Sequence, residues 1–304
     1  MATRIPLQAV EDLLLSVTQS AVPLLSQTSA HILRAGGKRL RPRLVLLAYA
    51  ATGGDNAEYA VPLAAAVEII HTATLVHDDI NDQGTLRRGH ETVNARWGKT
   101  YALLTGDFLF TKTYEVMAAY PPRFNRSLAQ AALELVEGET LQMHAAKAGQ
   151  LDRDTYYQII AKKTAALFVA CVELGAMAAD APQAQIEALT RYAFDVGMAF
   201  QITDDILDLI ADADQVGKTT GIDLEQGRGL AAAQLKNDGN APNARASLTQ
   251  RILDGTTLEA VVAVGRAKAQ ELIQTAQAAL QGLPPSAARD ELHALADYVL
   301  ERDH

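Results

Sequence analysis

The chain has a single cysteine, Cys171, and few aromatic residues, which make up 5% of its 304 residues. One cysteine excludes an intramolecular disulfide, and the apolar neighbours of Cys171 predict a buried, unreactive thiol. The N-terminus lacks the charged start and the apolar core of a secretory signal peptide. No stretch approaches about 18 uninterrupted apolar residues, so we expect no membrane span. These absences favour a cytoplasmic protein.

Positive charge is also scarce: the chain has 27 Lys and Arg against 36 Asp and Glu, and its net charge is −9 at pH 7. This balance, without basic stripes interleaved with aromatic residues, argues against a nucleic-acid-binding module. The Gly-x-x-x-x-Gly-Lys-Ser/Thr loop, the Gly-x-Ser-x-Gly elbow and the His-Glu-x-x-His pair are missing as well. P-loop nucleotide hydrolysis, serine hydrolysis and zinc proteolysis therefore lack their minimum residues.

Helical periodicity dominates what is present. Apolar residues make up 49% of the chain, enough for a large core. They recur at spacings of three and four, alanine is abundant and alternating patterns are scarce, so we predict an all-α fold. The helices are expected near 8–34, 42–52, 58–83, 99–119, 125–147, 153–178, 183–211, 244–281 and 286–302.

Proline and loop composition mark the connections. Pro23 falls inside the first predicted helix and is expected to kink or divide it. Segments 84–98 and 212–241 are rich in Gly, Asp, Lys and Arg and lack a long apolar stripe, so we predict functional loops there. No Gly/Ser linker or low-complexity tract divides the chain, and one domain spanning residues 1–304 is the simplest organisation.

Two short segments, Val76–Asp82 and Thr203–Asp208, share an acidic pattern. Aspartates occupy positions i, i+1 and i+4, and on a helix i and i+4 share a face while i+1 lies about 100° away. The aspartates are Asp78, Asp79, Asp82, Asp204, Asp205 and Asp208. Carboxylate oxygens suit Mg²⁺, which often binds through a few carboxylates together with substrate phosphate oxygens. The pattern predicts a magnesium and phosphate site, with a solvated acidic helix face as the alternative.

Basic residues accompany both acidic clusters. A glycine-led basic turn, Gly36–Pro42, precedes a predicted helix and suits an anion, although alone it could be a solvated loop or a nucleic-acid patch. The basic residues of interest are Lys38, Arg41, Arg87, Arg88, Lys163, Lys218 and Arg228. Each is weak evidence alone. Together they indicate room for two polyanions, one bound through metal and one bound by basic side chains.

Two further polar residues lie on the helices that carry the clusters. His71 precedes Asp78 by two helical turns, and a hydrogen-bonded core histidine is the alternative. Gln201 precedes Asp204 by one turn and could direct a neutral dipole into the same cavity.

In their order, these motifs resemble the trans-polyprenyl diphosphate synthases. The resemblance runs through Gly36–Pro42, Asp78–Asp82, Arg87-Arg88-Gly89, Lys163-Thr164, Asp204–Asp208, Gly217-Lys218 and Gly221–Leu224. It implies an all-α isoprenoid synthase fold, a single-domain helical bundle around a central cavity, usually as a homodimer. The implied reaction joins isopentenyl diphosphate to an allylic diphosphate.

The resemblance also implies roles for individual residues. The aspartates would bind three magnesium ions that hold the allylic diphosphate, with help from Arg87, Lys163 and Lys218. Isopentenyl diphosphate would bind against Lys38, Arg41, His71 and Arg88. Thr164 and Gln201 would present oxygen dipoles to the developing carbocation. Many relatives continue the second loop as Gly-Lys-x-Thr-Leu-Pro, whereas this chain has Gly227–Ala232, in which only Arg228 keeps the positive charge. We expect Arg228 still to help close the site.

Two small residues bear on product length. Ala73 and Thr74 lie five and four positions before Asp78, where short-chain relatives commonly place aromatic bulk. Their small size predicts an open tunnel and a product of roughly thirty to fifty carbons, whereas close helix packing is the alternative explanation. Other possibilities are a geranylgeranyl or farnesyl diphosphate synthase, a terpene cyclase, or a non-catalytic partner subunit of a heteromeric synthase.

Overall fold

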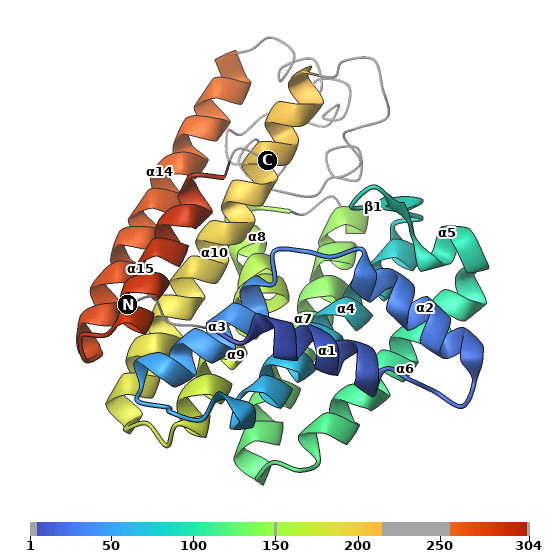
Figure 1. Cartoon of the computed structure of the whole chain (residues 1–304). Helices are drawn as coiled ribbons and strands as arrows, with labels where there is room; N and C mark the ends of the chain where they lie inside the picture. Colours follow the sequence, from blue (N-terminus) through green and yellow to red (C-terminus); the bar gives the residue numbers. More distant parts are fainter. Residues whose placement is uncertain (1–4, 149–150, 215–255, 303–304) are drawn as a thin grey trace. The chain divides into compact units, whose positions relative to one another are not determined.

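The computed structural model describes residues 5–148, 151–214 and 256–302, and most of these residues are helical (Figure 1). This confirms the prediction of an all-α fold. The α-helices are α1 Leu7–Val17, α2 Pro23–Arg34, α3 Leu40–Ala51, α4 Val61–Asn81, α5 Val93–Trp97, α6 Lys99–Met117, α7 Pro122–Ala148, α8 Arg153–Ile160, α9 Ala166–Ala178, α10 Gln183–Asp214, α14 Thr256–Ala279 and α15 Ala287–Leu300. Short turns of other helix types are η1 Ala57–Tyr59, η2 Ala161–Ala165 and η3 Leu280–Gly282.

Pro23 divides the first predicted helix, as the sequence indicated. Helix α1 ends at Val17, and Pro23 begins α2 at a first-turn position. Proline suits that position because the first helical N–H groups have no intrahelical partner to lose.

The predicted loop at 84–98 is more ordered than the sequence led us to expect. Two-residue strands β1 Leu86–Arg87 and β2 His90–Glu91 pair antiparallel. The turn between them has positive φ at Arg88 (52°) and Gly89 (76°), as tight hairpin turns require. Helix α5 follows, and the Thr92 hydroxyl caps it by accepting the Ala95 N–H at 3.0 Å. Turn chemistry, a helix cap and the packing of α5 against α4 and α6 therefore order a segment without an apolar stripe.

The chain divides into two compact units whose segments interleave along the sequence. The first unit comprises residues 1–130, 170–186 and 283–289, and the second comprises 131–169, 187–282 and 290–304. A single domain over residues 1–304 stays a prediction.

Helix α4 is the central element of the first unit, and α1, α3 and α6 pack against it. Together with η1 it forms the segment Ala57–Asn81, which is long and apolar enough to cross a membrane by length and composition. However, 78% of its most apolar window is buried inside the protein, as in the core helix of a folded domain. Packing against three helices accounts for its apolar composition. Cys171 is also buried in this unit, as predicted, and burial raises the pKa of its thiol.

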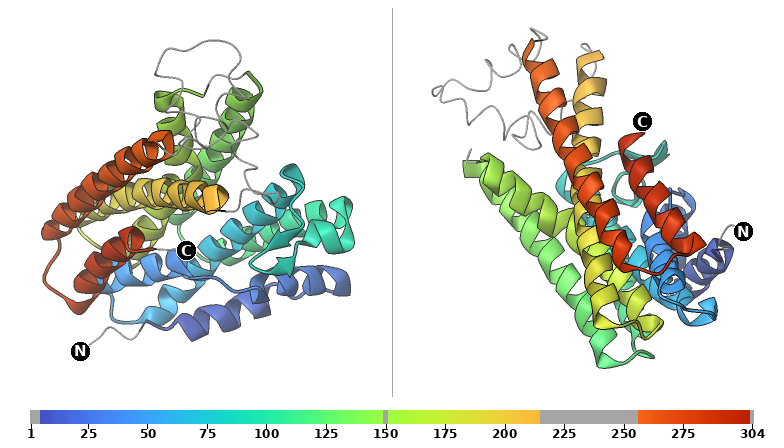
Figure 2. Two further views of the ribbon diagram at one scale, coloured as in Figure 1. Left: turned by 90° about the horizontal axis from the view of Figure 1, so that it is seen from above. Right: turned by 90° about the vertical axis from the view of Figure 1, so that its left-hand side faces the viewer.

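Helices α10, α14 and α15 pack together in the second unit. Figures 1 and 2 show α10 and α14 running alongside each other in every view. The Tyr192 hydroxyl on α10 donates to the Leu292 carbonyl on α15 at 2.6 Å. Gln277 on α14 donates to Asp297 on α15, also at 2.6 Å. These side-chain hydrogen bonds fix the registers of the three helices beside a core of aliphatic residues.

Candidate functional site

The first aspartate cluster lies at the C-terminal end of α4. Asp78 and Asp79 belong to the last turn, and Asp82 follows directly with helical φ and ψ. The Asp82 N–H donates to the Asp78 carbonyl at 2.8 Å, so the two residues lie one helical turn apart. The predicted spacing of these two carboxylates along one helix is therefore present in the fold.

Asp79, the middle residue of this cluster, is paired with Arg87 on strand β1. The Arg87 guanidinium donates from Nε to Oδ1 at 3.0 Å and from Nη2 to the same oxygen at 2.8 Å. The Asp79 residue is only 3% exposed, so this charge-assisted pair stabilises a carboxylate that water scarcely reaches. The β1–β2 hairpin thus brings Arg87, which is predicted to bind the allylic diphosphate, against the first acidic cluster.

Three residues predicted to bind isopentenyl diphosphate gather in the first unit. The Arg41 Nη1 lies 3.1 Å from the His71 Nε2, and because arginine only donates, this ring nitrogen must accept. Burial, followed by the nearby positive charges of Arg41 and Arg88, holds the pKa of His71 well below its usual range. His71 is therefore a neutral imidazole among cations, in an environment that favours an anionic ligand.

Gly37 explains how Arg88 reaches this group. A Cβ atom at Gly37 would lie 2.5 Å from Nη1 of Arg88, and the Gly37 φ is +150°, where side chains are rarely tolerated. The missing side chain leaves room for the Arg88 guanidinium against the turn that carries Lys38. The glycine-led basic turn and the arginine pair after α4 therefore meet in space.

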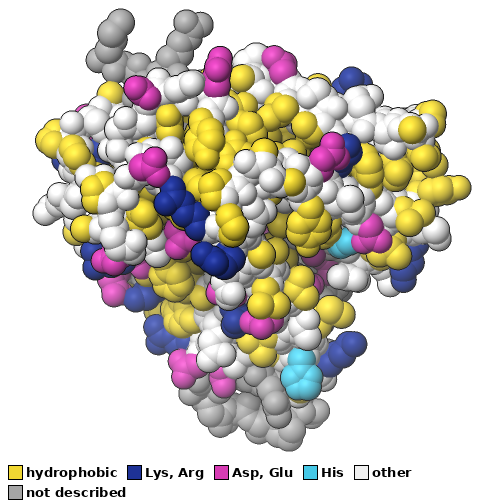
Figure 3. Space-filling model, turned by 90° about the horizontal axis from the view of Figure 1, so that it is seen from below, with side chains coloured by type: hydrophobic (Ala, Val, Ile, Leu, Met, Phe, Trp, Pro, Cys, Tyr) yellow, Lys and Arg dark blue, Asp and Glu magenta, His cyan; other side chains and the backbone are white. Residues whose placement is uncertain are grey.

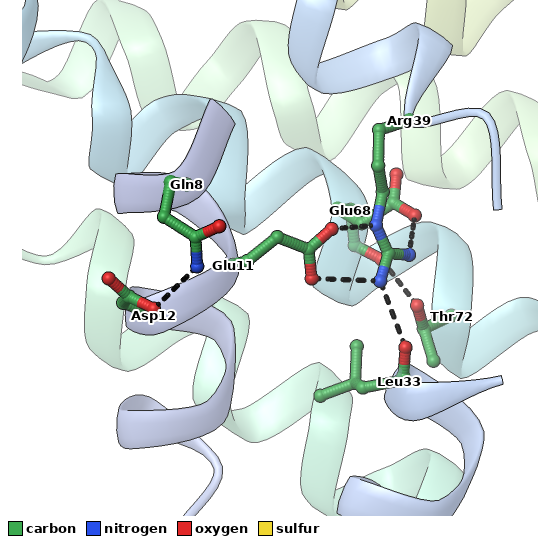
Figure 4. A network of polar contacts seen from close by, with 7 residues as sticks. All are labelled: Gln8, Glu11, Asp12, Leu33, Arg39, Glu68 and Thr72. Atoms are coloured by element: carbon green, nitrogen blue, oxygen red, sulfur yellow. Dashed lines mark hydrogen bonds and ion pairs between the residues drawn. The ribbon is translucent and has the colours of Figure 1, made fainter. Parts of the chain in front are cut away.

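Arg39 lies within the same turn, and sequence analysis assigned it no role. Figure 4 shows its guanidinium between Glu11 on α1 and Glu68 on α4. It donates to Glu11 at 2.5 and 3.1 Å, to Glu68 at 2.7 Å and to the Leu33 carbonyl at 2.9 Å. Its side chain is 9% exposed, and its φ of 48° lies in the left-handed region. Arg39 therefore anchors the turn between Lys38 and Arg41 to two helices.

The second aspartate cluster lies within the uninterrupted helix α10. Asp204 and Asp208 are one turn apart on this helix, as the spacing predicted. Asp204 forms an ion pair with Arg302, whose Nη1 lies 2.8 Å from Oδ1. The Arg302 guanidinium also lies over the Phe200 ring, 4.4 Å from its centroid. Arg302 lies outside every sequence motif, so no pattern in the sequence indicated this ion pair.

Asp205, the middle residue of the second cluster, accepts hydrogen bonds from two neutral donors. The Tyr156 hydroxyl on α8 donates to Oδ2 at 2.7 Å, and the Gln201 Nε2 donates to Oδ1 at 2.9 Å. The Gln201 Oε1 in turn accepts the Thr164 hydroxyl at 2.7 Å. Burial first, and then the negative charge of Asp205, raise the pKa of Tyr156 well above its usual range. The phenol therefore remains a donor.

Lys163 and Thr164 belong to η2, a turn of π-helix between α8 and α9. π-helical turns are rare and are frequent at functional sites. A Cβ atom at Gly197 on α10 would lie 2.7 Å from the Ala165 Cα, so this glycine permits the close approach of α10. Lys163 Nζ is ion-paired with Glu139 and lies 2.9 Å from the Gln142 Oε1, both on α7. Sequence periodicity did not reveal this local change of helix type.

The carboxylates of the two aspartate clusters suit a hard cation such as Mg²⁺. The described residues by themselves do not form a complete set of ligands for such an ion. Within residues 5–148, 151–214 and 256–302, no three His, Cys, Asp or Glu side chains are gathered as a metal site. Asp79 and Asp205 are engaged by Arg87, Tyr156 and Gln201. Substrate phosphate oxygens and waters commonly complete magnesium coordination, so the predicted magnesium site stays a prediction.

Lys218, Arg228 and the segment Gly221–Leu224 lie outside the described residues. The residues predicted to control product length can be placed: Ala73 is fully buried, and Thr74 is 8% exposed with its hydroxyl donating to the His71 carbonyl at 2.7 Å. Such burial agrees with the close-packing alternative, and a role in product length stays a prediction.

Comparisons with known proteins extend over nearly the whole chain. A family model described as polyprenyl synthetase matches residues 22–264. The heptaprenyl diphosphate synthase component 2 of Geobacillus stearothermophilus is 39% identical, with 98% of this chain and 96% of that protein covered. A short chain isoprenyl diphosphate synthase of Methanothermobacter thermautotrophicus is 34% identical, with 95% and 94% covered. The crystal structure of a polyprenyl synthase from Caulobacter crescentus CB15, complexed with calcium and isoprenyl diphosphate, has a TM-score of 0.86 at 33% identity, with 98% and 95% covered.

Proposed function

Because the chain belongs to the polyprenyl synthetase family, we propose that it condenses isopentenyl diphosphate with an allylic diphosphate to give a trans-polyprenyl diphosphate. The observation that carries this proposal is the gathering of Arg41, His71 and Arg88 in the unit that contains the first aspartate cluster. A neutral histidine among arginines suits a diphosphate that is bound directly rather than through metal.

Isopentenyl diphosphate is the proposed ligand of this basic group. Arg41 and Arg88 supply forked guanidinium donors, and Lys38 supplies a compact charge from the same glycine-led turn. Arg39 does not contact substrate in this proposal; its ion pairs to α1 and α4 hold the turn in place.

The allylic diphosphate is the proposed ligand of the acidic clusters. Asp78, Asp82, Asp204 and Asp208 would hold up to three magnesium ions, with Asp79 and Asp205 in the same clusters. Bound magnesium supplies Lewis-acid stabilisation of the negative charge on a departing diphosphate. Arg87, Lys163, Lys218 and Arg228 are proposed to add direct donors, and Arg228 to help close the site.

The proposed reaction breaks the allylic C–O bond, and the basic side chains stabilise the departing diphosphate. The Thr164 hydroxyl and the Gln201 amide present oxygen dipoles to the allylic cation. The alkene of isopentenyl diphosphate attacks that cation and forms the new C–C bond. The adduct then loses a proton to the departed diphosphate, which regenerates an allylic chain longer by one unit. Positioning the two substrates supplies much of the rate.

Product length is the finer part of the proposal. We propose roughly thirty to fifty carbons, because Ala73 and Thr74 add no aromatic bulk to α4. The heptaprenyl relative supports this range, whereas the short chain relative shows that the family at similar identity includes the alternative. Ala73→Phe is expected to shorten the product, and an unchanged product would show that the growing chain runs elsewhere.

A cytoplasmic homodimer completes the proposal. Helix α6 exposes Tyr101, Leu103, Leu104 and Tyr114, each at least 47% exposed, and such apolar side chains suit a subunit interface. Apolar side chains are also common on the face in Figure 3. Tyr114→Lys is expected to shift the sedimentation coefficient from dimer towards monomer, and a monomeric wild-type chain would contradict the proposed assembly.

A heteromeric enzyme is the second candidate, because the Geobacillus relative is named as a component. Activity of this chain expressed alone separates the two possibilities. The purified protein is incubated with farnesyl diphosphate, labelled isopentenyl diphosphate and magnesium, and the products are separated by length. Elongation by the single chain is expected. No elongation alone, but elongation with a second subunit, would favour the heteromeric enzyme; a product of fifteen or twenty carbons would contradict the long-chain proposal.

A further inference from the structure

The Gln201 side chain has an orientation that its neighbours determine. Its nitrogen faces Asp205 at 2.9 Å, and its oxygen faces the Thr164 hydroxyl at 2.7 Å. A carboxylate accepts hydrogen bonds and cannot donate them when ionised. An inverted amide would place the Gln201 oxygen against the Asp205 oxygen and lose the hydrogen bond. The carboxylate therefore selects one of two amide orientations that are nearly equal in shape.

Asp205 is itself held from the other side. The Tyr156 hydroxyl donates to Oδ2 at 2.7 Å, and the Tyr156 residue is only 2% exposed. Because Tyr156 is on α8 and Asp205 is on α10, the contact fixes the carboxylate relative to a second helix. Four side chains thus form one hydrogen-bonded chain, from Tyr156 through Asp205 and Gln201 to Thr164.

We propose that Asp205 and Tyr156 are positioning residues that keep the oxygens of Gln201 and Thr164, rather than an amide N–H, directed at the developing allylic cation. This inference rests on the proposed function. A carbonyl dipole stabilises an adjacent cation, whereas an N–H dipole in the same place destabilises it. The inference gives Asp205 a task that differs from magnesium binding, although sequence spacing grouped it with the metal ligands.

Asp205→Asn is the decisive variant because it keeps the side-chain shape and introduces a donor. The new side-chain amide can donate to the Gln201 oxygen, which allows the Gln201 amide to invert. We expect kcat for condensation to fall about hundred-fold, at the lower end of the range seen when one preorganised dipole is lost. The KM for the allylic diphosphate and the magnesium concentration for half-maximal rate are expected to remain within about two-fold.

Three matched variants separate the possible causes. Asp204→Asn removes a carboxylate proposed to bind magnesium, and it is expected to raise the magnesium requirement. Tyr156→Phe removes only the hydroxyl that holds Asp205, and it is expected to lower kcat about three- to ten-fold without changing that requirement. Tyr157→Phe is the control from the neighbouring position and is expected to leave kcat unchanged. Thermal unfolding confirms that each variant is folded.

A readout that needs no activity distinguishes this inference from the proposed function. The Gln201 side-chain NH₂ signals, assigned by their loss in Gln201→Leu, are expected to exchange slowly with solvent in the wild type and faster in Asp205→Ala. Equal exchange in both proteins overturns the inference. A raised magnesium requirement or an unchanged kcat in Asp205→Asn overturns it as well. An inactive wild type with slow exchange would instead contradict the proposed function alone.

Discussion

The two aspartate clusters have the same spacing in the sequence, but their middle residues have different partners in the structure. Both carboxylate oxygens of Asp79 accept hydrogen bonds from the charged guanidinium of Arg87. Asp205 accepts from a phenol and an amide, both neutral. A guanidinium neutralises its carboxylate, whereas a neutral donor orients a carboxylate without adding a positive charge. Repetition of a motif therefore does not imply repetition of each residue's role.

The first test of this comparison replaces the first aspartate of each cluster. Asp78→Asn and Asp204→Asn are each expected to reduce the condensation rate by about 10²- to 10³-fold, because each weakens stabilisation of the departing diphosphate. Steady-state rates over a magnesium titration measure the effect. If only one variant loses activity, the clusters do not share the proposed metal-binding role.

Arg39→Met is expected to give the largest loss of stability. Removing this cation leaves Glu68, whose side chain is 5% exposed, without its charged partner. Loss of one partner of such a pair destabilises by about 3 kcal/mol. The midpoint of urea unfolding measures the change. Glu11→Gln is the control, because the Glu11 side chain is 35% exposed and should matter less. Equal midpoints for Arg39→Met and the wild type would exclude the anchoring role.

The middle residues of the clusters can be compared through their partners. Arg87→Met leaves the buried Asp79 charge unneutralised, and we expect a loss of about 2 kcal/mol, reduced because the Arg87 side chain is 30% exposed. Tyr156→Phe removes one hydrogen bond from a neutral donor to the Asp205 carboxylate, for which we expect a loss of about 1.5 kcal/mol. Urea unfolding of both variants shows which substitution causes the larger loss of stability. The reverse order would show that the guanidinium contributes less than the phenol.

The smallest expected effect is the pH dependence of stability that arises from His71 in the first unit. The folded-state pKa of His71 lies well below its usual value, so the unfolded chain binds a proton first as the pH falls through about 6.5. Stability should therefore fall as the pH is lowered through that value, with a slope of at most about one proton. His71→Gln keeps an acceptor for Arg41 and should flatten the slope. An unchanged slope of stability against pH in this variant would show that other groups cause the pH dependence.

Local spacing was sufficient for predictions within one helix. The apolar repeats predicted α4 and α10, and the i and i+4 spacing correctly placed Asp78 beside Asp82 and Asp204 beside Asp208. Such contacts depend only on helix geometry, which is the same wherever the helix lies. The hairpin at 86–91 was missed because it depends on turn chemistry at Arg88 and Gly89 rather than on an apolar pattern.

Tyr156 shows why other parts of the candidate site were beyond sequence analysis. It lies in the predicted helix 153–178 and belongs to no motif, although a buried tyrosine usually needs a partner for its hydroxyl. That need was a usable signal, but it could not identify Asp205, which lies 49 residues away on another helix. Arg302 is still more distant from Asp204, and no motif contains it.

The sequence by itself determined the helical class, the positions of the two acidic clusters and the family. These follow from residue type and spacing along a helix, which are local properties. Only the tertiary structure decided that Arg87 neutralises Asp79, that Tyr156 and Gln201 hold Asp205, and that Arg39 anchors the basic turn. Those partners come from separate elements, and packing of the apolar faces sets which polar side chains meet.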